Sequence, residues 1–260
     1  DVPGRMLVVG GGYIGLELGS VYAALGSKVS VVELLPGLLP GADRDLVAPL
    51  AKRLAKKFEA IRLGTKVAAM KDDGARLLVT FEGPDGTREE TFDRALVSVG
   101  RKPNSENLGL DLAGIETDRR GFAVVDLQRR TSNPDVHAIG DIAGEPMLAH
   151  KGTHEARVAV EAISGRRAAF EPRAIPAVVF TDPEIAWVGL TETEAEKAGQ
   201  KVAVAKFPWT ASGRALTLER QEGLAKLVVD PETQRVLGLG LTGVGAGDMI
   251  AEGADRKSVV

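Results

Sequence analysis

A glycine-rich turn between two apolar segments, near the start of the chain, is the feature that most constrains the fold. Residues 5–33 read RMLVVGGGYIGLELGSVYAALGSKVSVVE, which predicts a strand, a tight turn, a helix and a second strand. Residues 6–9 are apolar and partly β-branched, as in a buried parallel strand. Gly10, Gly12 and Gly15 then form G-x-G-x-x-G, and the helix that follows offers free N–H groups to an anion. The segment therefore predicts a βαβ unit with a phosphate-binding turn.

Each of the three glycines has its own role in such a turn. Gly10 permits the sharp bend, Gly12 lets a pyrophosphate approach the backbone, and Gly15 lets the helix pack close to the strand. Glu33 ends the second strand, where an acid accepts hydrogen bonds from an adenosine ribose. A 2′-phosphate would meet this negative charge, so the pattern favours NAD over NADP. The alternative is a structural glycine turn with an incidental, exposed Glu33.

The composition narrows the function classes. The 260 residues are 44% hydrophobic and 27% charged, which fits a packed globular protein. The net charge of −3 gives no basic field for nucleic acid, and no apolar run approaches the roughly 20 residues that span a bilayer. No signal-peptide pattern is present, which favours a cytoplasmic location. Cysteine is absent, which excludes a disulfide scaffold, a thiolate metal site and a cysteine nucleophile within these residues.

The next part of the chain departs from a regular alternation of strands and helices. Residues 44–58 carry an apolar stripe at helical spacing, with Asp43 as the predicted N-cap. After a strand at 60–63, the turns DDG and GPDG predict an antiparallel meander in place of a helix. A strand at 94–100 then returns to the sheet. The predicted meander strands cover residues 66–71, 76–82 and 88–93.

The remainder changes character twice. Residues 105–172 predict two short strands, FAVVD and VHAIG, and a helix that stops at Gly165. From residue 173, alternating or apolar segments predict an antiparallel sheet, interrupted by a helix with a Thr191–Glu194 capping box and a Gly199 stop. These segments are PAVVF, AWVG, KVAVAKF, GLAKLVVD and VLGLGLTG. The expected fold class is α/β, with a Rossmann-like NAD domain containing a β-meander and a final α+β domain.

Four blocks, in this order, resemble the flavin-dependent pyridine-nucleotide disulfide reductases. They are GGGYIGLELG followed by VVE, then VSVGRKPN, TSNPDVHAIGDIAGEPMLAHKGTHEA, and IPAVVFTDPEIAWVGLTETEA. Within this family the likeness is greatest to the dihydrolipoamide dehydrogenases, through PMLAHK and FPWTASGRAL. The resemblance implies an NAD-binding Rossmann domain at 1–103, the C-terminal segment of an FAD-binding domain at 104–172, and a truncated dimer-interface domain at 173–260.

The resemblance also assigns NAD contacts. Residues 10–17 would hold the pyrophosphate, Glu33 the adenine ribose, and Glu17 the nicotinamide carboxamide, although a first-turn acid can simply complement the helix dipole. Tyr13 matches a position where some relatives place a movable lid over the flavin, with packing as an equal alternative. Gly100 would be a further contact or a plain exit from its strand. The full NAD set is Gly10, Gly11, Gly12, Tyr13, Ile14, Gly15, Glu17, Glu33, Val67 and Gly100.

The FAD contacts implied by the resemblance lie in the third block. Asp141 matches the carboxylate that binds the ribitol chain, and its alternative reading is a turn aspartate after glycine. The segment against the flavin consists of Met147, Leu148, Ala149 and His150, at the start of a helix. His150 and His154 are four residues apart, but a third ligand is not evident and no metal site is expected.

The implied reaction passes electrons between NAD, FAD and a cysteine pair that exchanges with dihydrolipoamide. In the family the cysteines precede the segment that begins here, and a histidine of the partner subunit, the proton shuttle, follows it. The resemblance therefore predicts a fragment that binds NAD and holds FAD poorly by itself, with the tail DRKSVV departing from the family pattern. The implied partners are a second copy, giving a homodimer, and lipoyl-bearing components of 2-oxoacid dehydrogenase complexes. Mercuric reductase, soluble transhydrogenase, NADH oxidase and a non-catalytic NAD-binding module remain as alternatives.

Overall fold

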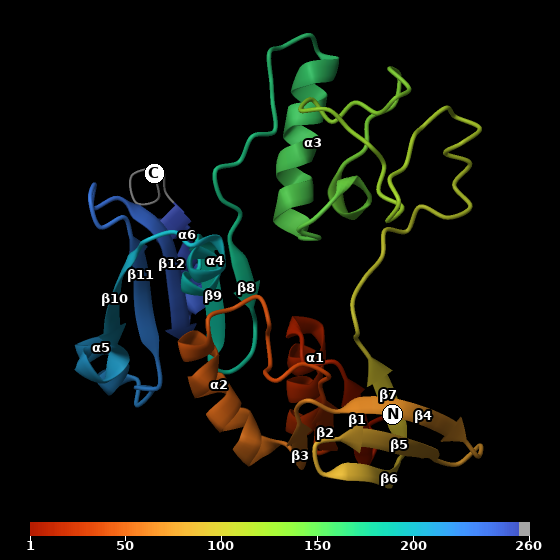
Figure 1. Cartoon of the computed structure of the whole chain (residues 1–260), viewed down its shortest axis with the longest axis vertical. Coiled ribbons are helices and arrows are strands. Elements are labelled where there is room, and N and C mark those ends of the chain that lie inside the picture. The colour runs from red at the N-terminus through yellow and green to blue at the C-terminus, as the bar shows by residue number, and fades with distance from the viewer. Residues whose placement is uncertain (255–260) are drawn as a thin grey trace. The chain divides into compact units, whose positions relative to one another are not determined.

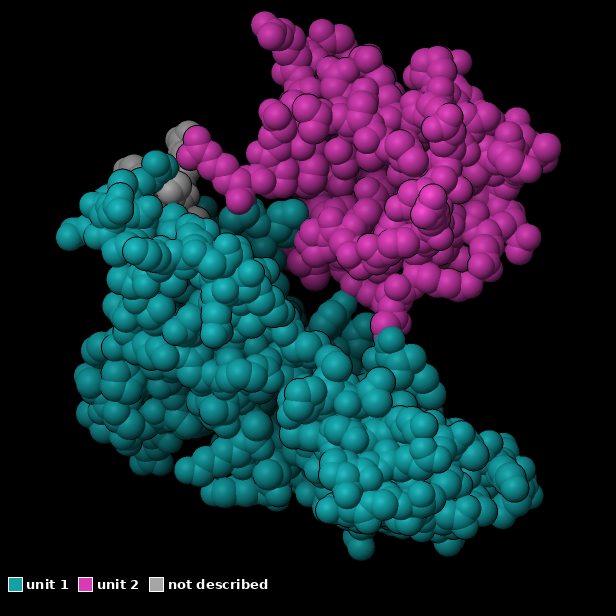
Figure 2. All heavy atoms as spheres, viewed as in Figure 1, with its two compact units in different colours: residues 1–99, 174–260 teal, residues 100–173 magenta. Residues whose placement is uncertain are grey.

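The computed structural model describes residues 1–254 and divides the chain into two compact units. The first unit combines residues 1–99 with the residues from 174 onward, and the second contains residues 100–173 (Figure 2). Within the described residues, no helix is both long and apolar enough to cross a lipid bilayer. The first and third predicted segments thus form one structural unit, while the predicted domain boundaries stay a prediction. Residues 255–260, which include the tail DRKSVV, lie outside the described part.

A four-stranded parallel sheet forms the first part of the first unit. Its strands are β1 (Arg5–Val9), β2 (Lys28–Val32), β3 (Ala60–Arg62) and β7 (Arg94–Val97), in the order β3-β2-β1-β7. Helix α1 (Tyr13–Ala24) connects β1 to β2, and α2 (Arg44–Lys57) connects β2 to β3 (Figure 1). Strands β1 and β2 are parallel neighbours, and α1 is the crossover connection that such a pair needs. The predicted βαβ arrangement is therefore confirmed.

An antiparallel meander packs on one face of this sheet. It consists of β4 (Lys66–Asp72), β5 (Leu77–Gly83) and β6 (Gly86–Phe92). The side chains of β1 alternate between two clusters: Leu7 packs with Phe81 and Phe92 of the meander, whereas Val8 packs with residues of α1 and α2. The predicted replacement of a helix by a meander is therefore confirmed.

A five-stranded antiparallel sheet forms the second part of the unit. Its strands are β8 (Ala177–Val179), β9 (Glu184–Gly189), β10 (Ala203–Pro208), β11 (Leu224–Val229) and β12 (Val236–Gly243), in the order β10-β11-β12-β9-β8. Along β9, Ile185 packs in the cluster that contains α2, while Ala186 packs with Ile250 of α6 (Ala246–Ala254). Because alternate residues of a strand face opposite sides, α2 and α6 lie on opposite faces of this sheet. Helix α2 therefore lies between the two sheets and packs against both.

The predicted capping box in this sheet is confirmed. Helix α4 (Glu192–Ala198) begins with Thr191, whose Oγ1 accepts a hydrogen bond from the Glu194 N–H at 3.1 Å. The Glu194 carboxylate in turn accepts from the Thr191 N–H at 3.0 Å. Gly199 ends the helix with a left-handed φ of 64°. A short 3₁₀ turn, η2 (Trp209–Ala211), and helix α5 (Gly213–Thr217) complete the unit.

The second unit contains little regular structure besides α3 (Ala149–Ile163) and the 3₁₀ turn η1 (Gly140–Ala143). The strands predicted at FAVVD and VHAIG are wrong: residues 122–126 and 136–140 form only isolated bridges, Thr117 to Ala123 and Arg130 to His137. The physical reason is local. The Asp126 carboxylate accepts hydrogen bonds from backbone N–H groups at residues 128 and 130, which closes a turn instead of a ladder.

Two further differences concern the first unit. Strand β7 ends at Val97, before the predicted end at Gly100. Asp43 precedes α2 as predicted, but its side chain makes no capping hydrogen bond to that helix. Its Oδ1 instead accepts from the Thr193 N–H at 3.0 Å and its Oδ2 from the Glu192 N–H at 3.0 Å, at the start of α4. Asp43 therefore caps a helix that is remote in sequence.

Candidate nucleotide-binding site

At two glycines of the turn after β1, backbone atoms occupy the space that a Cβ would need. Gly10 has a φ of +109°, and a Cβ there would lie 2.4 Å from the Ser98 carbonyl oxygen. A Cβ on Gly15 would lie 2.2 Å from the carbonyl oxygen of Gly10. By contrast, no described atom lies within 4 Å of a Cβ built on Gly12. Close packing on one side and open space on the other leave the backbone accessible at Gly12.

The N-terminus of α1 begins at this open position. Gly12 is the N-cap and has an extended backbone. Among the described residues, no side chain caps this helix, and its first turn contains no acidic residue. The first N–H groups of a helix have no partner within the helix, and they carry the positive end of its dipole. The turn therefore offers an anion the positive end of the helix dipole at an open backbone position.

Glu33 lies at the end of β2, next to this turn, and is only 9% exposed. Its Oε2 accepts a hydrogen bond from the Gly11 N–H at 2.6 Å, and its Oε1 accepts from the Leu35 N–H at 2.8 Å. It is therefore not an incidental exposed acid. A carboxylate has about four acceptor positions, and these two hydrogen bonds use two of them.

The other predicted residues of α1 have contacts inside the first unit. Glu17 lies beyond the first turn of α1, so the alternative of a first-turn acid is wrong. Its carboxylate accepts a hydrogen bond from the Phe180 N–H at 2.7 Å, just after β8. Tyr13 is half-buried and packs against the cluster that contains Val8, and Ile14 is also half-buried. The packing role weighed for Tyr13 is thus seen, and its role as a lid stays a prediction.

Val67 and Gly100 belong to different units. Val67 lies in β4, half-buried against the cluster that contains Leu7 and Phe81. Gly100 follows β7 at the start of the second unit, is exposed, and has a φ of +125°. Residues other than glycine rarely adopt this backbone conformation.

Within the second unit, Arg101 connects the predicted FAD contacts. Its guanidinium lies 3.3 Å from Asp141 Oδ2 and also donates to the carbonyl oxygen of Met147. Helix α3 begins at Ala149 with Leu148 as its N-cap, and in this fully described unit no side chain caps it. Asp141, Ala149 and His150 are exposed, while Met147 is buried. The unit thus presents a carboxylate and an uncapped helix N-terminus that one arginine holds together.

Sequence reasoning missed a buried ionic cluster beneath these residues. Glu155, on α3, has no exposed surface; its Oε1 lies 3.0 Å from both Lys151 Nζ and an Arg129 nitrogen. Its Oε2 accepts from the Gly140 N–H at 2.7 Å, and Lys151 also donates to the Gly140 carbonyl oxygen at 3.1 Å. The i,i+4 spacing of Lys151 and Glu155 was the available signal. The cluster holds the residue that precedes Asp141.

Residues 1–156 match the family described as pyridine nucleotide-disulphide oxidoreductase, and residues 175–255 match its dimerisation domain.

The chain belongs to the pyridine nucleotide-disulphide oxidoreductase family.

The chain is similar to family members named dihydrolipoyl dehydrogenase. Dihydrolipoyl dehydrogenase of Haemophilus influenzae is 48% identical over 254 residues, which are 97% of this chain and 52% of that protein. The same enzyme of Thermus scotoductus is 48% identical over 96% of this chain and 55% of its own length. The chain thus spans about half the length of the curated relatives it matches.

Solved structures of the family show the same fold. A point mutant of the HOCl-induced flavoprotein disulfide reductase RclA of Escherichia coli, as its Cu(II) complex, matches with a TM-score of 0.90 and 30% identity. The match covers 99% of this chain and 58% of that one. LpdA of Mycobacterium tuberculosis matches with a TM-score of 0.87 and 29% identity, over 98% of this chain and 55% of its own.

Pyridine nucleotide-disulphide oxidoreductases use FAD and NAD. The open backbone at Gly12 and the partly satisfied carboxylate of Glu33 fit the pyrophosphate and the adenosine ribose of NAD. The exposed Asp141 and the uncapped start of α3 fit the hydroxyl and anionic groups of FAD. Each unit therefore carries donors or acceptors suited to one of the family's two cofactors.

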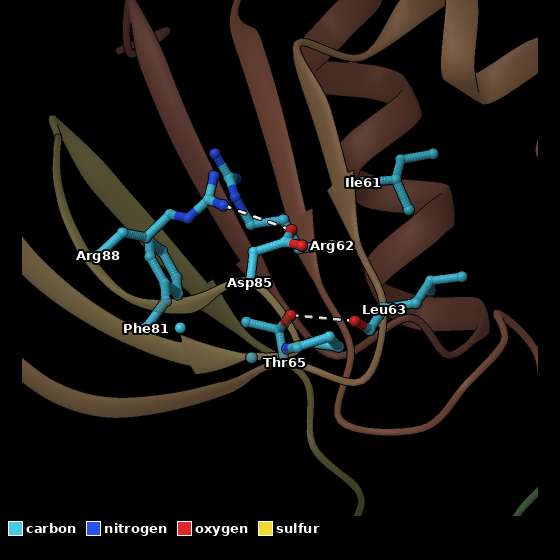
Figure 3. Close-up of a pocket in the computed structure, with 10 residues that line it drawn as sticks. Ile61, Arg62, Leu63, Thr65, Phe81, Asp85 and Arg88 are labelled. Atoms are coloured by element: carbon cyan, nitrogen blue, oxygen red, sulfur yellow. Dashed lines mark hydrogen bonds and ion pairs between the residues drawn. The ribbon is translucent and has the colours of Figure 1, made fainter.

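A separate cavity of about 170 Å³ lies between β3 and the turn of the meander (Figure 3). Arg62, Arg88 and Asp85 line it, and Arg88 pairs with Asp85 at 3.5 Å. None of the predicted site residues lines this cavity. Residues 1–254 contain no group of three or more His, Cys, Asp or Glu side chains arranged to hold a metal ion.

Proposed function

We propose that the first unit binds NAD at the turn between β1 and α1. The pyrophosphate approaches the backbone at Gly12, where the helix N-terminus supplies N–H groups and the positive end of the dipole. Glu33 accepts hydrogen bonds from the adenine ribose and repels a 2′-phosphate. The observation that supports this most directly is the combination of an open Gly12 with a buried, oriented Glu33.

The remaining predicted contacts complete this proposal. Glu17 serves the nicotinamide end, and Val67 and Gly100 are further NAD contacts, as the family resemblance implies. In the second unit, Asp141 accepts from the ribitol chain of FAD, and Met147, Leu148, Ala149 and His150 lie against the flavin. FAD supplies the hydride chemistry when it is bound, while these residues bind and orient it.

For the whole protein we propose the oxidation of dihydrolipoamide by NAD⁺, giving lipoamide, NADH and a proton. The relatives named dihydrolipoyl dehydrogenase, at 48% identity, support this choice over mercuric reductase, soluble transhydrogenase and NADH oxidase. The 260 residues contain no cysteine, so they supply nucleotide binding and not the exchanging disulfide. A non-catalytic NAD-binding module would share the same nucleotide site.

The assembly and location are also proposals. Residues 175–255 match a dimerisation domain, which supports a homodimer. Association with lipoyl-bearing components of 2-oxoacid dehydrogenase complexes follows from the proposed substrate, and a cytoplasmic location follows from the sequence prediction.

Calorimetric titration of the chain with NAD⁺ and NADP⁺ tests the proposal. We expect NAD⁺ to bind, and NADP⁺ to bind at least about tenfold more weakly, because its 2′-phosphate meets the Glu33 carboxylate. Equal binding of the two nucleotides would show that Glu33 does not discriminate against a 2′-phosphate. If neither nucleotide binds, the proposed site is wrong. In the enzyme that contains this chain, turnover of dihydrolipoamide with NAD⁺ tests the whole reaction.

A further inference from the structure

The second glycine of the turn, Gly11, is held at both of its backbone polar groups. Its N–H donates to Glu33, as described above, and its carbonyl oxygen accepts from the Leu39 N–H at 3.0 Å. Leu38 packs directly on it, because a Cβ on Gly11 would lie 2.7 Å from a Leu38 methyl group. The position of the turn therefore depends on residues 38–39, which lie between β2 and α2.

Arg44, in the first turn of α2, holds this connecting segment. Its guanidinium donates to the Leu38 carbonyl oxygen at 2.6 Å and also to the carbonyl oxygens of Leu39 and Ala42. One planar guanidinium thus satisfies three carbonyl groups of the same short segment. Lysine has a single ammonium group and could not reproduce this planar fork.

Asp43, the residue before Arg44, is anchored in the second sheet of the unit. It is 4% exposed, and Lys226 Nζ of β11 lies 2.8 Å from its Oδ2. The same carboxylate accepts from the first N–H groups of α4, as described above. Lys226 is itself 1% exposed and lies 3.0 Å from Asp45 and 2.5 Å from Glu192. The segment is therefore fixed at one end by a buried cation from a different sheet.

We propose that Lys226 and Arg44 are positioning residues for the nucleotide-binding turn, acting through Asp43 and residues 38–42. Lys226 belongs to the part of the chain that matches the dimerisation domain, whereas Gly11 belongs to the turn that is proposed to bind nucleotide. The connection runs through ionic and hydrogen-bonded contacts within one compact unit. The effect on affinity rests on the proposed NAD function; the effect on the conformation of Gly11 does not.

The test compares Lys226→Met with a matched control, Lys206→Met. Lys206 belongs to the same group of charges, but its side chain is 44% exposed, and its ion pairs are to Asp45 at 2.6 Å and Glu192 at 3.9 Å. Two quantities are measured on each folded variant of the full chain: the ¹H–¹⁵N amide shift of Gly11 and the dissociation constant for NAD⁺. We expect Lys226→Met to move the Gly11 signal and to raise the constant about tenfold, comparable to one lost charged hydrogen bond. Lys206→Met changes neither.

A second variant keeps the test decisive if Lys226→Met fails to fold. Arg44→Gln leaves the Lys226 charges intact but removes the three carbonyl contacts, and we expect the same movement of the Gly11 signal. An unchanged Gly11 signal in the folded variants, or an equal effect of Lys206→Met, would overturn the proposal. If the unaltered chain binds no NAD⁺, the proposed function fails, while the Gly11 signal still decides whether Lys226 and Arg44 position the turn.

Discussion

Glu155 Oε2 accepts a hydrogen bond from the Gly140 N–H at 2.7 Å, and this contact links α3 to the residue before Asp141. The same carboxylate is the counterion of two side chains that are almost completely buried, Lys151 and Arg129. The backbone next to Asp141, a predicted cofactor contact, is thus held by the fully buried carboxylate of Glu155.

Replacing Glu155 by glutamine should destabilise the chain strongly. The amide retains one acceptor but no charge, so Lys151 and Arg129 remain buried without a counterion, which costs about 3–5 kcal/mol. Urea unfolding followed by circular dichroism measures the loss. Glu145→Gln is the control, because it breaks an exposed pair with Arg120 and should leave the midpoint unchanged. Equal midpoints for the two variants would contradict this account.

Alanine at two positions of the glycine turn should separate binding from stability. Gly12→Ala adds a methyl group in open space at a φ of −77°, so we expect an unchanged melting temperature but at least about tenfold weaker NAD⁺ binding. Gly15→Ala places its methyl group against the Gly10 carbonyl oxygen and should destabilise the fold by about 1–3 kcal/mol. Thermal melting and calorimetric titration of both variants check this. An unaltered affinity in Gly12→Ala would place the phosphate elsewhere.

Glu33→Gln should narrow the preference for NAD⁺ over NADP⁺. Removing the charge relieves the repulsion of a 2′-phosphate, and we expect the ratio of the two dissociation constants to fall about tenfold. The glutamine can accept only through its single carbonyl oxygen, so either the Gly11 or the Leu35 N–H loses its partner and NAD⁺ itself binds more weakly. An unchanged ratio of the two constants would show that Glu33 does not face the ribose.

The pH dependence of stability should show the contribution of Asp43. Burial alone would raise its pKa, but hydrogen bonds from Lys226, Thr193 and Glu192 outweigh burial and lower the pKa from 3.8 to about 2. A lowered pKa means that the stabilisation is complete above about pH 4 and is lost as the pH falls toward 2. The contribution is about 2 kcal/mol. Urea midpoints between pH 2 and 6 should fall less steeply for Asp43→Asn than for the unaltered chain, and parallel curves would disprove the contribution.

The elements of the first 58 residues were predictable because their signals are local. An apolar run marks β1, the glycines mark the turn, and the stripe of α2 predicts its end within one residue. The capping box at Thr191 is equally local. The predicted strands at 122–126 and 136–140 failed because their apolar residues needed partner strands, and the chain supplies hydrogen-bonded turns there instead.

The burial of Lys226 could not be predicted from the sequence. In β11 the apolar Leu227 is 36% exposed while its neighbour Lys226 is 1% exposed, so hydrophobicity alone selects the wrong face of the strand. The residues that make burial of this lysine favourable are Asp43, Asp45 and Glu192, which are remote in sequence. Likewise Glu33 was predicted beside the nucleotide, but its hydrogen bond to the Gly11 N–H depends on how the turn closes.

The shared position of α2 has a consequence for the order of events during synthesis. The cluster around Val8 and Leu54 also contains Val179 and Ile185, so residues 1–99 cannot complete their core until a segment beyond residue 174 has left the ribosome. Residues 100–173 emerge in between and form a unit of their own. The nascent chain therefore carries an unfinished hydrophobic surface on α2 while residues 58–176 are made. Slow translation ahead of β8 would prolong this exposure.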